Sequence, residues 1–117
     1  MALTINASPL FGPTPLTTTV TVLGTVPNTG ANTTVLTNGQ IRFSNTTGGS
    51  ISITAYAVPV GVAPSSVNAF ATTEPVAANS HVDMAIPLIQ GGGSLQALAS
   101  GNASIVAFQL SGVIVAQ

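Results

Sequence analysis

Apolar and polar residues alternate over most of the chain, and this period of two indicates half-buried β-strands. The clearest example is the segment 50–60, in which four residues form an apolar row on one face: Ile51, Ile53, Ala55 and Ala57. Tyr56 and Val58 make the opposite face partly apolar as well, so we expect that face to meet a loop or another subunit. Pro59 is expected near the end of this strand.

Further strands are predicted where β-branched residues or the same alternation recur between Gly, Pro and Asn residues. They cover residues 17–26, 33–36, 40–45, 81–86 and 94–99, and a last strand begins near residue 103. The dipeptide Asn38-Gly39 predicts a tight hairpin. Residues 61–80 are expected to form the longest irregular connection. The inward row of the last strand is predicted to be Val106, Phe108, Leu110, Ile114 and Ala116.

These elements predict an all-β fold. About eight short strands, turn signals every 8 to 12 residues and no helical periodicity indicate an antiparallel β-sandwich or jelly roll. A small closed barrel is the main alternative.

The first sixteen residues carry three prolines, which disfavour both a helix and a continuous ladder of strand pairing. We therefore predict an extended, Pro-rich N-terminal arm over residues 1–16 and a single sandwich domain over 17–117. Leu10, Phe11 and Leu16 would let this arm anchor on a neighbouring subunit. The alternative is that the arm packs along its own domain.

Charged side chains make up only 3% of the 117 residues, whereas an average soluble domain carries about 25%. Such a chain lacks the scattered charge that keeps a small free protein soluble, so we predict a subunit held in an assembly, with a homotrimer as the expected form. No basic patch is available for phosphates, so no nucleic acid is expected as a partner. No membrane partner is expected either, because no uninterrupted apolar run is long enough to span a bilayer.

The few chemically active side chains do not form a recognisable catalytic motif. His81 and Asp83 lie two residues apart on a predicted strand, so the carboxylate could orient the imidazole from the same face. However, the chain has no Gly-x-Ser-x-Gly elbow for a nucleophile. With no cysteine, Glu74 is the only further acidic or thiol ligand for a metal. We expect no enzymatic activity, no cofactor and no metal.

Arg42 is predicted to point outward, with Glu74 and Asp83 as its two candidate ion-pair partners. An exposed pair within one subunit would add little stability, whereas a pair across a desolvated interface would set register and specificity. An unpaired surface arginine is the third alternative. We include Arg42, Glu74, Asp83, His81 and Tyr56 among the candidate interface residues, together with the apolar trio of the arm.

Several short sequence segments occur in a characteristic order. Residues 41–47 (IRFSNTT) are followed by 50–59 (SISITAYAVP), and then by 64–66 (PSS), 93–97 (GSLQA) and 111–113 (SGV). This succession resembles small β-sandwich virion structural proteins of tailed bacteriophages, from about residue 40 to the end of the chain. Many of those proteins carry an acidic residue in the Gly-rich turn, and this turn has none.

The resemblance implies a non-enzymatic protein of the virion, made in the host cytoplasm. The leading expectation is a capsid cement or decoration protein that sits on the shell as a homotrimer and bridges subunits of the major capsid protein. A tail, baseplate or fibre-attachment module is the alternative within the particle. A carbohydrate- or receptor-binding β-sandwich is the competing class, but sugar sites stack on exposed aromatic rings, and the chain has no Trp and a single Tyr.

Overall fold

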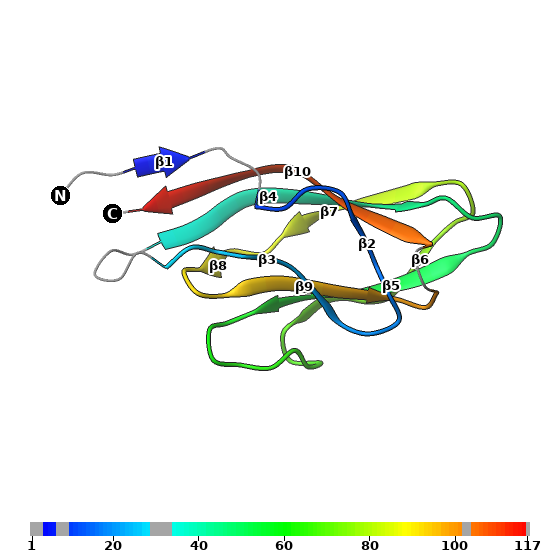
Figure 1. The fold of residues 1–117 in the computed structure, drawn as a ribbon, viewed down its shortest axis with the longest axis horizontal. Coiled ribbons are helices and arrows are strands. Elements are labelled where there is room, and N and C mark those ends of the chain that lie inside the picture. The colour runs from blue at the N-terminus through cyan, green and yellow to red at the C-terminus, as the bar shows by residue number, and fades with distance from the viewer. Residues whose placement is uncertain (1–3, 7–9, 29–33, 102–103, 117) are drawn as a thin grey trace.

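The computed structural model describes residues 4–6, 10–28, 34–101 and 104–116. These residues form two antiparallel sheets packed against each other, so the predicted β-sandwich is confirmed and the closed barrel is not formed (Figure 1). The described strands are β1 (Thr4–Asn6), β2 (Thr14–Pro15), β3 (Thr21–Thr25), β4 (Thr34–Asn45), β5 (Ile51–Val58), β6 (Ala69–Val76), β7 (His81–Ile86), β8 (Ile89–Gln90), β9 (Ser94–Ala99) and β10 (Ile105–Ala116). In these parts of the chain, no helix is long and apolar enough to cross a membrane.

The strand order places distant parts of the sequence side by side. One sheet has the order β1-β10-β4-β7, with β2 beside β10 and β8 beside β4. The other has the order β3-β9-β5-β6. Figure 1 shows the first sheet lying above the second along the long axis of the molecule. Because most connections pass from one sheet to the other, each sheet is held together by contacts between remote segments.

The core lies between the inward rows of the two sheets. Its largest fully buried side chains are Phe43, Leu16, Leu36, Ile41, Ile53, Leu95 and Ile105. The predicted apolar row of β5 lies in or against this core, and so does the predicted inward row of β7, Val82, Met84 and Ile86. The alternation of apolar residues therefore identified these two strands and their inward faces correctly.

The predicted hairpin at Asn38-Gly39 is wrong, because β4 runs through this dipeptide as one strand. Asn38 does adopt the left-handed conformation that Asn-Gly favours, with a φ of 55°. The result is an irregularity in the ladder, since β10 pairs with Thr37 on one side of the dipeptide and with Gln40 on the other. A reversal of the chain here would remove half of the pairing between β4 and β10, which is the longest in the protein.

The predicted inward row of β10 is also wrong over its first half. Ile105 and Ala107 are fully buried, whereas Leu110 is exposed. The ladder shifts on either side of Ser111, and Ile114 then packs against the core. A bulge inserts an extra residue, so the inward positions change from odd to even numbers along the strand.

The segment 61–80, predicted as irregular, contains the edge strand β6. Its outer positions include Glu74 and Pro75, and Thr73 has a φ of 49°. The register with β5 shifts twice along its length. A strand with such irregularities has no clean alternation, and these are features that protect a sheet edge from pairing with other chains.

The N-terminal segment from residue 10 belongs to the sandwich, so the predicted boundary after residue 16 is wrong. Leu16 and Phe11 lie in the core, 0% and 8% exposed, and Leu10 packs against it. The Leu16 amide donates a hydrogen bond of 2.8 Å to the Ile105 carbonyl, and β2 continues this pairing with β10.

The side chain of Gln109 on β10 holds the same segment in place. Its Oε1 atom accepts hydrogen bonds from the Leu10 and Phe11 amides. The three apolar residues predicted to anchor on a neighbour therefore pack into their own domain. Residues 1–3 and 7–9 of the predicted arm lie outside the described residues.

Candidate functional site

The charged side chains gather on strands that adjoin at one side of the sandwich. Arg42 lies on β4, directly opposite Asp83 on the neighbouring β7, and His81 is exposed two residues before Asp83. Glu74 is exposed on β6, the edge strand of the other sheet, which lies against β7. The sequence analysis named these residues individually as interface candidates, and the topology brings Arg42 and Asp83 into direct contact.

Arg42 pairs with Asp83 of the same chain. Its Nε atom donates to Oδ1 at 2.7 Å and its Nη2 atom donates to Oδ2 at 2.9 Å, so both carboxylate oxygens are engaged by the guanidinium fork. The two side chains are 37% and 36% exposed. At this exposure the pair is screened by water, and its main effect is to favour the observed register between β4 and β7.

The pairing with Arg42 shifts the pKa of Asp83. The hydrogen bonds from Arg42 lower the pKa of the Asp83 carboxyl, and the positive charges of Arg42 and His81 lower it further. The same hydrogen bonds raise the pKa of Arg42.

We predict that Asp83→Asn lowers the melting temperature slightly at neutral pH and removes one acid-dependent contribution to stability. A depressed folded-state pKa stabilises the protein above the unfolded value of 3.8, and this stabilisation is lost as the pH falls through the folded value. Thermal melts of the two proteins should therefore begin to approach each other as the pH falls below 3.8 and should converge only below the depressed folded-state pKa of Asp83. Glu74→Gln is the matched control, and a Glu74→Gln effect equal to that of Asp83→Asn would contradict the assignment.

The acidic residues and the histidine do not form a metal centre. Among the described residues, which include Glu74, His81 and Asp83, no three of His, Cys, Asp or Glu come together as a metal site. The Asp83 carboxylate is already occupied by Arg42. The Arg42–Asp83 pair therefore joins β4 to the neighbouring strand β7.

The outer face of β5 is divided between a covered and an open part. Val58 is 2% exposed, so this part of the face is covered by the protein itself. The segment after β5 returns along the same strand, where the Ala57 amide donates to the Asn68 carbonyl at 3.0 Å. Tyr56 remains half-exposed opposite Gln96 of β9.

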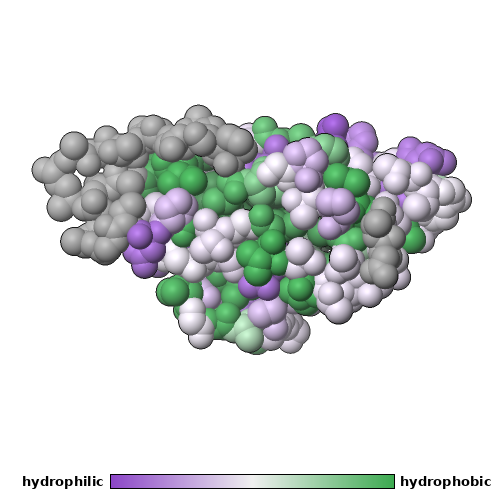
Figure 2. All heavy atoms as spheres, viewed as in Figure 1, coloured by the Kyte–Doolittle hydropathy of each residue, from purple (hydrophilic) through white to green (hydrophobic). Residues whose placement is uncertain are grey.

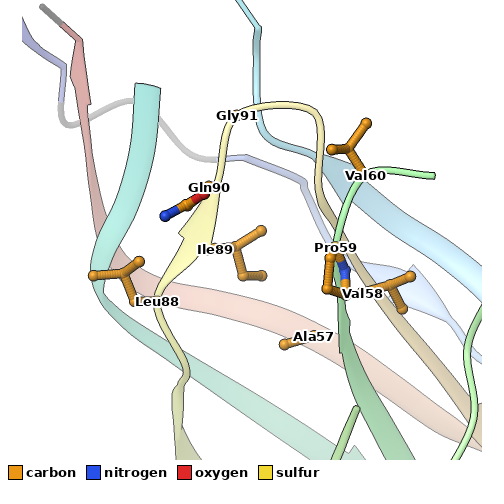
Figure 3. A pocket seen from close by; sticks show the side chains of 8 residues that line it. All are labelled: Ala57, Val58, Pro59, Val60, Leu88, Ile89, Gln90 and Gly91. Atoms are coloured by element: carbon orange, nitrogen blue, oxygen red, sulfur yellow. The ribbon is translucent and has the colours of Figure 1, made fainter. Parts of the chain in front are cut away.

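An apolar pocket opens between the two sheets at the end of β5, and the sequence analysis did not identify it. Its volume is about 270 Å³, and it is lined by Ala57, Val58, Pro59, Val60, Leu88, Ile89, Gln90 and Gly91 (Figure 3). One wall continues from β5 and the other comes from β8 and the residue before it. The signal in the sequence is a pair of apolar runs, 58–60 and 86–89, each interrupted by a proline where a strand ends.

The remaining surface is mostly neutral. Figure 2 shows one face, on which strongly hydrophilic residues form small groups among weakly polar and hydrophobic ones. The chain matches no protein-family model, and searches of curated proteins and of solved structures find no match either.

Proposed function

We propose that this chain is a non-enzymatic structural protein of a phage virion, a cement or decoration protein that binds the major capsid protein and bridges its subunits. The observation that carries the proposal is a folded β-sandwich with only 3% charged residues, two of which, Arg42 and Asp83, pair with each other. Most of its described surface offers neutral polar and apolar groups. The phrases shared with virion β-sandwich proteins, from residue 41 to residue 113, support the same role.

Such a protein would bind its neighbours through a large contact area and not through ion pairs. A standard protein–protein interface takes about 800 Å² from each partner. The accessible surface of this chain is 5843 Å², so one contact of that size leaves most of the surface for other neighbours. Apolar contacts and hydrogen bonds from Thr, Ser, Asn and the backbone would hold the subunits, with a small Coulomb contribution.

The aromatic residues favour this role over sugar binding. Phe11 and Phe43 are buried, and Phe70, Phe108 and Tyr56 are half-buried. These five are all the aromatic residues of the chain, and every one lies in the described part. Since sugar sites use an open aromatic face for stacking, none of these rings makes a strong candidate platform.

The proposal predicts that phage particles lacking this chain assemble but lose DNA at a lower temperature than complete particles. Adding the purified protein to the deficient particles should restore the release temperature, because a cement protein stabilises a shell that already exists. DNA release followed by a fluorescent dye measures both effects. Particles that retain DNA normally but lack tails or do not adsorb would assign the chain to the tail or fibre instead.

A further inference from the structure

The dipeptide Asn38-Gly39 on β4 is made of two residues that the fold selects separately. Asn38 has a φ of 55°, and Asn is among the few residues with a side chain that adopt this left-handed conformation readily. A Cβ atom at position 39 would lie 3.0 Å from the Cβ atom of Ile86 on β7, so any side chain here would crowd the neighbouring strand. The strand therefore favours Asn and Gly side by side.

Asn followed by Gly is also a chemically labile dipeptide. The backbone nitrogen of the glycine attacks the side-chain carbonyl carbon of the asparagine, the bond from this carbon to the side-chain nitrogen breaks, and ammonia leaves with the proton of the attacking nitrogen. Water then opens the cyclic imide to give aspartate or isoaspartate. Glycine has no side chain to hinder the attack. Asn38 is the one asparagine of the chain that precedes a glycine.

The Asn38 side chain is free to rotate toward the backbone that follows it. It is exposed, and within the described residues no hydrogen bond holds its amide group. The side chains of Asn45 and Asn68, in contrast, are each held through both amide atoms. Position 38 therefore combines the labile dipeptide with an unrestrained side chain.

The attacking nitrogen, that of Gly39, is restrained by the last rung of the ladder between β4 and β7. The Asn45 amide donates to the Ser80 carbonyl at 2.8 Å at the other end of this ladder. The register continues without a shift to Gly39, which lies opposite Ile86. Because hydrogen-bonded pairs recur at every second position of an antiparallel ladder, the Gly39 amide points at Ile86. Strand β7 ends at Ile86, so opening of this terminal rung is enough to free the nitrogen.

We propose that Asn38 is a site of spontaneous deamidation in the folded chain, with water as the reactant and opening of the Gly39–Ile86 rung as the step that admits the attack. The reaction adds a negative charge to a chain whose formal net charge is -1. Aspartate tolerates the left-handed conformation, whereas isoaspartate places its Cβ carbon in the backbone where β4 pairs with β10. One product therefore keeps this ladder and the other disrupts it. The reaction takes place in the free chain and does not depend on the proposed virion role.

Mass spectrometry of peptides from the purified full-length chain, incubated at mildly alkaline pH, measures the reaction. Asn79 is the matched control in the same molecule, because it is also exposed and has a φ of 52° but precedes a serine. Loss of ammonia should be faster at Asn38 than at Asn79 by about tenfold or more, which corresponds to a barrier lower by about 1.4 kcal/mol. It should accelerate with pH, because the attacking nitrogen gives up its proton. Equal rates at the two positions, or an Asn38 that stays intact, would overturn the proposal.

Ile86→Val tests the role of the terminal rung. This variant removes a buried methyl group beside Gly39 and should loosen the rung, so the reaction at Asn38 should accelerate by about 2- to 10-fold. The rate at Asn79 should stay unchanged. An unchanged rate at Asn38, or an equal acceleration at both asparagines, would show that the rung does not control the reaction.

Thermal melts of the separated products test the effect on the ladder. Asn38→Asp should melt close to the wild type, and the isoaspartate form isolated after incubation should melt at a lower temperature. An isoaspartate form as stable as Asn38→Asp would refute the predicted disruption of the pairing between β4 and β10.

Discussion

Leu16→Ala is expected to lower the free energy of unfolding by about 2–5 kcal/mol, the range found when a fully buried leucine is truncated in a packed core. Leu16 is 0% exposed and lies in the same core cluster as Phe43 and Ile105. Urea denaturation followed by circular dichroism measures the change. Leu110→Ala removes the same atoms from a side chain that is 47% exposed and should cost much less.

The Leu16→Ala substitution distinguishes two roles of the N-terminal segment, namely packing into its own sandwich and clamping a neighbouring subunit. If Leu16→Ala leaves stability unchanged but weakens attachment to particles, the segment clamps a neighbour and its packing in the sandwich is incidental. The structure predicts the opposite result. For the same reason, deletion of residues 1–15 should destabilise the fold, because it removes Phe11 from the core and β2 from its pairing with β10.

Asn45→Ala is expected to destabilise the protein by about 1–3 kcal/mol for each buried polar group left without a partner. Asn45 is 2% exposed, and its Nδ2 atom donates to the carbonyls of Val76 at 2.9 Å and Gly49 at 2.8 Å. Its Oδ1 atom accepts from the amide and the hydroxyl of Thr47. Because Asn45 lies on β4 and Val76 on β6, this side chain joins the two sheets.

The hydrogen bonds of the Asn45 side chain also predict how an aspartate at this position would behave. Asn45→Asp would direct a carboxylate oxygen at two carbonyl oxygens, so burial and repulsion should raise the pKa of the new carboxyl. The stability of this variant should then fall as the pH rises above the ordinary Asp value of about 3.9. Thr46→Ala, at an exposed neighbouring position, is the control. Equal stabilities for Asn45→Ala and Thr46→Ala would show that the network contributes nothing.

The sequence predicted the strands whose alternation is clean and whose ends are marked by Gly or Pro. The bounds of β9 were predicted as observed, and β7 ends where Pro87 requires it. Prediction from the sequence failed where pairing with a distant strand overrides a local conformational preference. Asn38-Gly39 favours a reversal, but β10 pairs along both sides of it, and no local pattern reveals that partner. The bulge beside Ser111 likewise depends on the facing strand.

The candidate site was predictable as a set of residues but not as an arrangement. Arg42 had two candidate partners, and only the register between β4 and β7 selects Asp83. The prolines near the N-terminus indicated interrupted pairing, but they carry no information about where Leu16 packs. The pocket joins the end of β5 to residues about thirty positions later, so it requires the topology to be known.

In the proposed function, this chain is an abundant component of a phage shell and is held there by uncharged contacts. The most direct test is to purify particles on a density gradient, wash them with low and then high salt, and quantify this chain against the capsid protein by mass spectrometry. We expect a fixed copy number per particle, comparable to that of the capsid protein and unchanged by salt from about 0.05 to 0.5 M, because so few charges are available to be screened. Absence from the particles, a few copies per particle, or release by salt would contradict it.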